Sequence, residues 1–224
     1  MGLCIIKSME TKNECIFSDP MTNKEISEFK EILSNNFIEK FNKSFEEIEK
    51  DKRLFRFYLK HKIQNSKGNK ILTVIAMNPS KAKEDENDDT ISNIENHLMK
   101  NHEEYSEFII YNLFPIRIPN SEYLKLLVNE SNFKTELQKN DEYIKKHINE
   151  TSNDILLAWG SDYHKDAMKR PWLNDLSKKN IFVGSLNSNS SPITFSPLSY
   201  NKMDKTKKLK EVIINKKTQK LEYK

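Results

Sequence analysis

Residues 71–80 read ILTVIAMNPS, an apolar run that ends in an amide, a proline and a hydroxyl. A short, continuous apolar run that lies between helical stretches is typical of a strand buried on both faces of a parallel sheet. Three later segments have the same character: FIIYNL at 108–113, DILLAW at 154–159 and the shorter IFVG at 181–184. We therefore predict four buried strands. The first covers residues 71–77 and is followed directly by Asn78.

Segments with helical character lie between the predicted strands, at 89–100, 121–128, 134–150 and 163–179. The resulting order β-α-β-α-β-α-β predicts an α/β sandwich with right-handed crossovers. Upstream, residues 24–49 have helical spacing and residues 54–63 alternate like a half-exposed strand. We therefore predict two parts: a helical extension at 1–50 that packs on the core, and an α/β domain at 51–224 that ends in a basic tail.

The composition excludes several classes of site. The chain has four glycines, and neither a G-x-G-x-x-G nor a G-x-x-x-x-G-K-[ST] motif occurs, which excludes a Gly-rich phosphate-binding loop. Its five histidines and two cysteines lack the spacing of zinc ligands. The acidic run EDENDD at 84–89 has the carboxylates of a Mg²⁺ site, but we interpret it as a solvated loop in which Asp89 or Thr90 caps the next helix. We predict no metal and no cofactor.

The cysteines and the charges indicate where the protein works. Cys4 and Cys15 are the two cysteines, and we find neither a signal peptide nor a membrane span, so we expect a reduced, cytoplasmic, monomeric protein without a membrane partner. The formal net charge is +4, and residues 202–224 hold nine Lys against three acids. Such a tail either contacts polyphosphate or is a solvated terminal element, and the sequence leaves both interpretations open.

Polar residues follow the predicted strands at their carboxyl ends, which is where ligands bind in α/β sheets. Asn78 ends the first strand and Asn112 lies in the second. Taken alone, Asn78 is also explained as the side chain that closes an Asx-turn, and Asn112 as a core amide paired to nearby backbone. Trp159, which ends the third strand, is more typical of a core residue, and Arg117 of a surface cation.

Taken together, these segments resemble a known family. The motifs are NPS-x-A at 78–82, DDTI at 88–91, YNLFPIR at 111–117, AWG at 158–160 and SPLSY at 196–200. They occur in the order found in the bacterial and phage family named domain of unknown function 1643, and the resemblance spans roughly residues 50–200. It implies no settled activity.

The same segments are similar to those of the uracil-DNA glycosylase superfamily. The similar motifs are AMNPS at 76–80, FIIYN at 108–112, LLAWG at 156–160 and TFSPLS at 194–199. This resemblance implies a three-layer α/β/α sandwich with a central, mostly parallel, four-stranded sheet. It also implies DNA, single- or double-stranded, as the partner, and an enzyme that flips uracil or a related base out of DNA and hydrolyses its N-glycosidic bond.

The resemblance assigns roles to individual residues. Asn78 would position the attacking water, and Thr194 stands where the superfamily has a His that stabilises the leaving base. Asn112 would read the base, because an amide offers a donor and an acceptor together. Phe114 would stack on the base. The remaining base contacts would come from Met77 and Ser80.

The DNA contacts implied by the resemblance lie mainly in the last motif. Leu198 would fill the gap that the flipped base leaves, as apolar wedges do between base steps. Ser196 and Ser199 would bind the flanking phosphates. The full set of implied DNA contacts is Ser196, Pro197, Leu198, Ser199 and Arg117.

Two departures from the superfamily pattern leave alternatives open. Thr194 is a neutral and weaker donor than His, and losing such a donor reduces the rate about 10²–10³-fold. Ser80 stands where a thymine-blocking Tyr is found, so a larger base would fit. The chain is therefore either a glycosylase, a catalytically weak or inactive nucleic-acid-binding member of the same fold, or another base- or nucleotide-processing enzyme.

Overall fold

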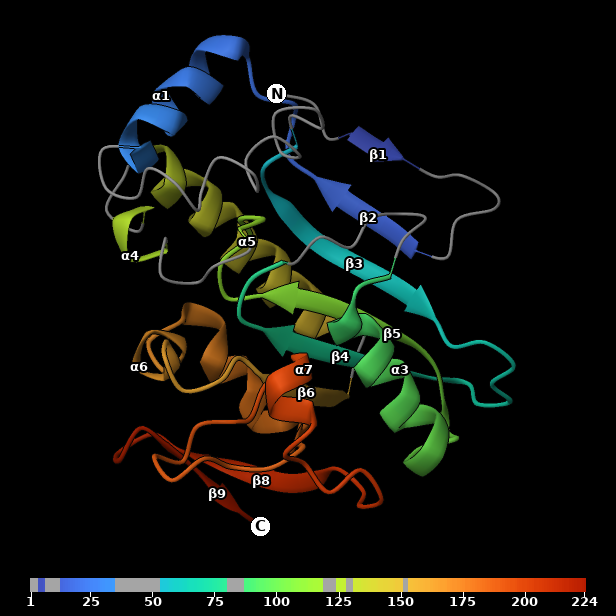
Figure 1. The fold of residues 1–224 in the computed structure, drawn as a ribbon. Helices are drawn as coiled ribbons and strands as arrows, with labels where there is room; N and C mark the ends of the chain where they lie inside the picture. The colour runs from blue at the N-terminus through green and yellow to red at the C-terminus, as the bar shows by residue number, and fades with distance from the viewer. Residues whose placement is uncertain are drawn as a thin grey trace.

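A mixed β-sheet runs through the centre of the protein (Figure 1). The structure is a computed structural model and describes residues 4–6, 13–34, 53–79, 87–118, 124–127, 131–150 and 153–224. The strands in these ranges are β1 (Cys4–Ile6), β2 (Asn13–Phe17), β3 (Arg56–Lys62), β4 (Lys70–Ala76), β5 (Tyr105–Asn112), β6 (Asp154–Ala158), β7 (Asn180–Val183), β8 (Lys210–Asn215) and β9 (Lys220–Tyr223). They form one nine-stranded sheet in the order β1-β2-β3-β5-β4-β6-β7-β8-β9.

The sheet is parallel in its middle and antiparallel at both sides. Strand β4 pairs in parallel with β5 and β6, and β6 pairs in parallel with β7. The flanking strands β3 and β8 pair antiparallel with β5 and β7. The predicted α/β class is therefore confirmed, but the sheet is larger than the four strands expected, because β1, β2 and β3 extend it on one side and β8 and β9 on the other.

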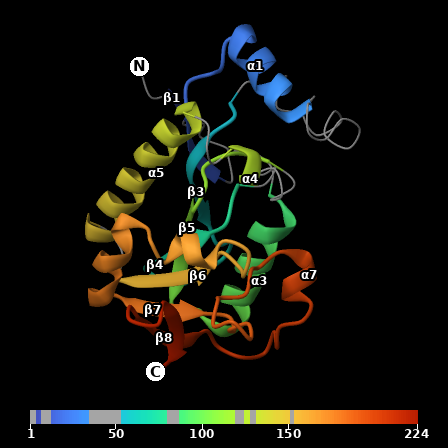
Figure 2. The ribbon, with the colours of Figure 1, turned by 90° about the vertical axis from the view of Figure 1, so that its left-hand side faces the viewer.

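Helices cover both faces of the sheet (Figure 2). They are α1 (Asn23–Ser34), α3 (Asp89–Asn101), α4 (Leu124–Leu127), α5 (Ser131–Glu150), α6 (His164–Ala167), the 3₁₀ helix η2 (Pro171–Lys178) and α7 (Pro197–Tyr200). Helix α1 occupies the first part of the helical region predicted at 24–49; residues 35–52 lie outside the described residues. In both views α5 lies on one side of the sheet, and α3 and α7 lie on the other.

The helix predicted at 163–179 is wrong as a single element, because it is divided into α6 and η2. Pro171 begins η2, and Arg170 before it has φ −66° and ψ 142°, an extended conformation. A proline has no amide hydrogen for the helix and disfavours the helical region for the residue before it. The apolar spacing of the segment survives this break, since Trp172, Leu173 and Leu176 are all buried.

Two buried clusters hold the helices on the sheet. The first cluster joins the sheet to α5 and η2 and includes Ile75, Ile109, Leu157, Ile144, Ile148 and Trp172. The second cluster joins the sheet to α3 and α7 and includes Leu72, Val74, Ile110, Ile91, Leu98, Phe195 and Tyr200. Successive side chains of a strand point to opposite faces, and β4 needs apolar residues on both, which explains its continuous apolar sequence.

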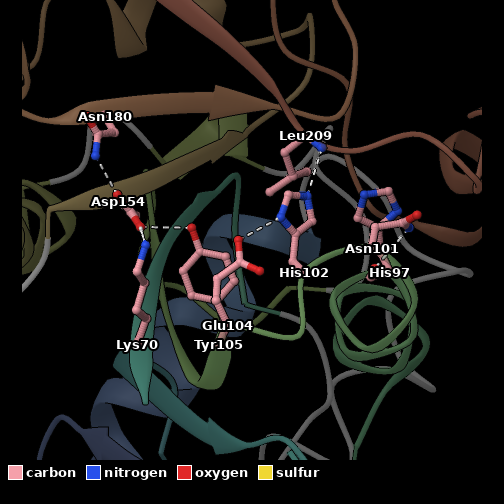
Figure 3. A network of polar contacts seen from close by, with 9 residues as sticks. All are labelled: Lys70, His97, Asn101, His102, Glu104, Tyr105, Asp154, Asn180 and Leu209. Atoms are coloured by element: carbon pink, nitrogen blue, oxygen red, sulfur yellow. Dashed lines mark hydrogen bonds and ion pairs between the residues drawn. The ribbon is translucent and has the colours of Figure 1, made fainter. Parts of the chain in front are cut away.

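A polar network ties together the amino ends of the four parallel strands (Figure 3). The Asp154 carboxylate accepts hydrogen bonds from the Tyr105 hydroxyl at 2.9 Å and the Asn180 side-chain amide at 2.7 Å. The Lys70 ammonium lies 3.8 Å from the same carboxylate. Burial, and then the hydrogen bond to Asp154, raise the pKa of Tyr105, so its hydroxyl stays a donor. These four residues begin β4, β5, β6 and β7, so one carboxylate sets where all four strands start.

The described helices show no candidate for a membrane span, since none combines the necessary length with an apolar sequence. Cys15 on β2 is buried.

Replacing Asp154 with Ala should destabilise the fold strongly. The change leaves the buried Tyr105 hydroxyl without its acceptor, and each buried polar group left unsatisfied costs about 1–3 kcal/mol. We expect the free energy of unfolding, measured by urea titration, to fall by about 2 kcal/mol. The control is Asp162→Ala at an exposed position, which should change it by less than about 0.5 kcal/mol. Equal small effects of both changes would show that the network does not set the strand ends.

Candidate functional site

Three residues lie side by side where the parallel strands end. Asn112, the last residue of β5, is in register with Ala76 of β4, and Ala76 is in register with Ala158 of β6. Ala76 and Ala158 belong to the second cluster. Strand alternation directs Asn112 to the same face as Ile110, two residues earlier. An amide therefore stands next to two small side chains at the carboxyl edge.

Asn112 is a buried amide whose donor is not used. The residue is 1% exposed, and its Nδ2 has no hydrogen-bond partner among the described residues. Its backbone carbonyl accepts a hydrogen bond from the Asn140 side chain of α5 at 2.8 Å, which fixes this end of β5. Leaving such a donor unpaired costs about 1–3 kcal/mol, and native structures contain few examples. Asn112 is one of several residues with a buried polar atom that has no partner among the described residues, which makes its amide a candidate for binding a ligand.

Asn78 connects the ends of β4 and β5. Its Nδ2 donates to the carbonyl of Ile118 at 2.7 Å and to that of Pro79 at 3.2 Å. These contacts differ from the Asx-turn considered from the sequence, because the side-chain nitrogen donates, mainly to a carbonyl in the loop after β5. Both bonds use the nitrogen, so within the described residues the amide oxygen of this half-buried side chain remains an unused acceptor.

Phe114 and Met77 lie against the first cluster, on the face away from the Asn112 side chain. The Phe114 ring is 1% exposed and packs edge-on against Tyr163 with 4.8 Å between ring centroids. The chain turns after Asn112, so the alternation of β5 no longer applies, and Phe114 falls on the opposite side. The base-stacking role of Phe114 stays a prediction. Ser80 lies outside the described residues.

Arg117 is held inside the protein. It is 8% exposed, its Nη1 donates to the carbonyl of Arg53 at 3.0 Å, and its guanidinium carbon lies 5.3 Å from the centre of the Phe17 ring. Its backbone amide donates to the carbonyl of Leu54 at 2.9 Å. These contacts join the loop after β5 to the start of β3. Its role as a DNA contact stays a prediction.

The loop from Thr194 to Ser196 packs on the end of β6. Gly160, directly after that strand, has φ +81°, and a Cβ there would lie 2.8 Å from Cγ2 of Thr194. Position 160 therefore requires glycine for both its conformation and the close approach of the loop. The Thr194 and Ser196 hydroxyls are 2.9 Å apart and share a hydrogen bond. Asn93 of α3 donates to the carbonyl of Phe195 at 2.9 Å.

Helix α7 presents its first turn to solvent. Ser196 is the residue before the helix, and Pro197 occupies the first helical position, where a missing amide hydrogen does no harm. Leu198 follows and is 73% exposed. Ser199 is half-buried and Tyr200 is buried against α3 and Phe195. The helix is thus anchored by Tyr200 while a large apolar side chain stands in water.

The structure brings some of the predicted residues together and separates others. Asn78, Asn112 and the loop at 194–196 lie at the carboxyl ends of neighbouring strands, on β4, on β5 and against the end of β6. Phe114 and Arg117 are buried in other surroundings. Among the residues that the structure describes, no group of three or more His, Cys, Asp or Glu side chains is placed to hold a metal ion.

A model of the family described as Protein of unknown function (DUF1643) matches residues 56–198. The chain belongs to the DUF1643 family. The matched range begins at the start of β3 and ends in α7, so it includes Asn78, Asn112 and the loop up to Leu198. Comparison with curated proteins and with solved structures finds no match.

Asp88 is a site candidate in this DUF1643 chain that the sequence interpretation missed. It caps α3: its Oδ1 accepts from the amide of Ile91 at 2.9 Å, and its backbone is extended. The expected caps, Asp89 and Thr90, are wrong, because both are already helical. The Asp88 Oδ2 is buried and has no partner among the described residues. The signal was available, since a cap side chain binds the amide three residues later.

His97 of α3 packs against the segment 194–200. It is 1% exposed and packs edge-on against the rings of Phe195 and Tyr200, with centroids 5.6 and 6.3 Å away. Burial, and then the nearby His102, lower the pKa of His97 to about 4. The imidazole is therefore neutral near pH 7. Both of these rings belong to the segment 194–200, so His97 helps to hold that segment against α3.

Removing the Asp88 cap should weaken α3 and the loop that rests on it. Asp88→Ala deletes the acceptor for the Ile91 amide, and we expect a loss of about 1 kcal/mol in the free energy of unfolding, measured by urea titration. Asp88→Ser keeps a capping oxygen and should remain within about 0.5 kcal/mol of the parent protein. A loss of the same size in the Ser variant would assign the effect to the carboxylate charge instead of the cap.

Proposed function

We propose that this DUF1643 protein is a DNA glycosylase-like protein that flips uracil or a related base out of DNA and hydrolyses its N-glycosidic bond. The observation that carries the proposal is the buried, unpartnered Nδ2 of Asn112 at the carboxyl end of β5, next to the strand that leads to Asn78. The resemblance of four motifs to the uracil-DNA glycosylase superfamily supports it.

Base recognition would use the Asn112 amide. Its Nδ2 would donate to a carbonyl oxygen of the base, and its Oδ1 would accept the neighbouring ring N–H, so one side chain matches two adjacent positions of uracil. Among the described residues this buried donor has no partner. Binding a base would supply a partner and remove the penalty of about 1–3 kcal/mol. The unsatisfied donor would in this way favour base binding.

Water activation would use Asn78. Its Nδ2 is held by the carbonyl of Ile118 at 2.7 Å, which fixes the plane of the amide. The Oδ1, which lies in the same plane as the nitrogen, can accept a hydrogen bond from water and hold that water in one direction. A neutral amide orients water without removing its proton, so the reaction depends on stabilising the departing base. Asn112 and the Thr194 hydroxyl would donate hydrogen bonds to the negative charge that develops there.

DNA engagement would use the exposed turn of α7. Leu198 is 73% exposed, and the hydroxyls of Ser196 and Ser199 flank it in the chain. An apolar side chain that inserts between base steps stabilises a flipped nucleotide. Hydroxyls beside it can bind phosphate oxygens, which position the protein without reading sequence.

A second function, DNA binding without excision, is favoured by one specific contact. The Thr194 hydroxyl already shares a hydrogen bond of 2.9 Å with the Ser196 hydroxyl. When Thr194 is the donor of this bond, it would have to give the bond up to serve the leaving base, and in either direction its hydroxyl carries no charge. A protein with this arrangement would still be able to hold a flipped base at Asn112.

One assay separates the two functions. The protein is incubated with single- and double-stranded oligonucleotides that contain one uracil, and alkali then cleaves any abasic site. Cleavage at the uracil position is the expected result. DNA that is bound but never cleaved, in either form, would reject excision and leave the binding function.

Replacing Asn112 with Leu should separate stability from activity. Leu has a similar shape and removes a donor that has no partner, so the free energy of unfolding should stay constant or rise. Excision should fall at least about 10²-fold, because a donor to the developing charge is removed. The matched control is Asn174→Ala, at an exposed position of η2, which should change neither quantity. A clear loss of stability in Asn112→Leu would mean that the amide is a structural residue.

Replacing Leu198 with Ala should affect duplex DNA more than single strands. A wedge acts only where a base leaves a stack, so we expect excision from duplex to fall roughly tenfold and excision from a single strand to change little. The control is Met99→Ala on α3, where the side chain is 47% exposed. Both variants should unfold within about 0.5 kcal/mol of the parent protein, because exposed side chains contribute little to stability. Equal losses on both substrates would contradict the wedge role.

A further inference from the structure

The positive charge of the protein is concentrated in its last 23 residues. The whole chain has 37 Lys and Arg against 33 Asp and Glu, a net charge of +4. Residues 202–224 contain nine Lys and three acids, a net charge of +6, so residues 1–201 carry −2. Residues 1–201 are thus slightly acidic, and the excess of cations is clustered in residues 202–224. Such clustering of positive charge is typical of a surface that binds polyanions.

The part of this tail nearest to the candidate site is residues 202–210, named here the basic segment. It contains five lysines and one acid, Asp204, which pairs with Lys207 at 3.0 Å. Met203 and Leu209 are its buried residues. The Met203 side chain packs against Gly184 and close to Phe195: a Cβ at position 184 would clash with Cε of Met203 and lie 3.3 Å from Cζ of Phe195. With the two apolar side chains turned inward, most of the lysines are turned outward.

The basic segment is held in place by the end of α3 (Figure 3). The Asn101 side chain donates to the carbonyl of Lys205 at 3.1 Å. The amide of Leu209 donates to Nε2 of His102 at 2.9 Å. The Lys205 ammonium lies 4.8 Å above the Tyr200 ring. A segment fixed at both ends loses little conformational freedom when it binds, so its charges are arranged in advance.

The basic segment continues directly from α7. The amide of Lys202 donates to the carbonyl of Ser199 at 3.0 Å, and that of Met203 to the carbonyl of Tyr200 at 3.2 Å. The exposed Leu198 is thus only four residues from the first lysine. A nucleic acid that meets Leu198 would also meet the basic segment.

We propose that the basic segment binds the phosphates of a nucleic-acid backbone beside the position of Leu198, independently of base identity. The inference rests on the proposed function for the choice of DNA as the polyanion. Within the segment no large apolar side chain is exposed, so a membrane surface would find nothing to insert. The hairpin turn that follows also carries two lysines, Lys216 and Lys217. It contacts α6, because the Gln219 carbonyl lies 3.2 Å from Nε2 of His164.

The test compares two double variants of the full chain with the same change in charge. Lys202→Gln/Lys208→Gln removes two exposed cations of the basic segment, and Lys216→Gln/Lys217→Gln removes two exposed cations of the hairpin turn. Binding to a labelled, uracil-free duplex is measured by fluorescence anisotropy at salt concentrations between about 50 and 200 mM. Excision of uracil is measured separately on the same proteins.

We expect the first double variant to bind roughly tenfold more weakly, and the slope of log K against log salt to become shallower by about 0.9 for each phosphate that is no longer neutralised. The second double variant should bind like the parent protein. Equal weakening in both would assign the effect to net charge and overturn the proposal, as would unchanged binding in the first. Competition by polyglutamate as strong as that by DNA would also overturn it. If the parent protein binds but never excises uracil while the two doubles still differ, excision is rejected and the basic segment stands.

Discussion

The carboxylate of Asp154 is the contact on which the arrangement of the sheet depends. It joins the first residues of β4, β5, β6 and β7 through Lys70, Tyr105 and Asn180. The strands differ in length, from four residues in β7 to eight in β5, and Asp154 is in register with Leu72, two residues after Lys70. Ala76 lies beside both Asn112 and Ala158 at the opposite end of β4, about 20 Å from Lys70 for a strand of this length. A contact that holds the amino ends of these strands together thus also supports the positions of the three residues at the other edge.

The two edges of the parallel strands differ in whether their buried polar groups have hydrogen-bond partners. At the amino edge the buried carboxylate of Asp154 has partners from three other strands. At the carboxyl edge the Nδ2 of Asn112 and the Oδ2 of Asp88 are buried without partners among the described residues. Polar groups left unsatisfied reduce stability, and proteins retain such groups chiefly at functional sites. The two groups at the carboxyl edge therefore support the proposed site, beside the resemblance of the sequence motifs.

The sequence predicted the middle of the sheet well because burial on both faces leaves a continuous apolar run. The predicted strands at 71–77 and 181–184 differ from β4 and β7 by one residue at each end. Strands β8 and β9 were not assigned, because their lysines obscure the buried Val212 and Leu221. The direction of Phe114 could not be predicted either, since it depends on how the chain turns after Asn112. The hydrophobic pattern predicts which segments form buried strands, but tertiary contacts decide which way a side chain beyond the strand end points.

The residues that we propose for excision, Asn78, Asn112 and Thr194, are neutral, which constrains the proposed chemistry. Asn78 would orient water without taking its proton, and Thr194 would donate a hydrogen bond to the departing base without carrying a positive charge. Stabilisation must then come from donors already aimed at the place where charge develops, which need no reorganisation during the reaction. Asn112 would meet this condition, because its buried Nδ2 has no partner within the part of the chain that the structure describes. The same isolation that weakens the free protein is what would make this amide an effective donor, so the instability of the site and its proposed activity have one cause.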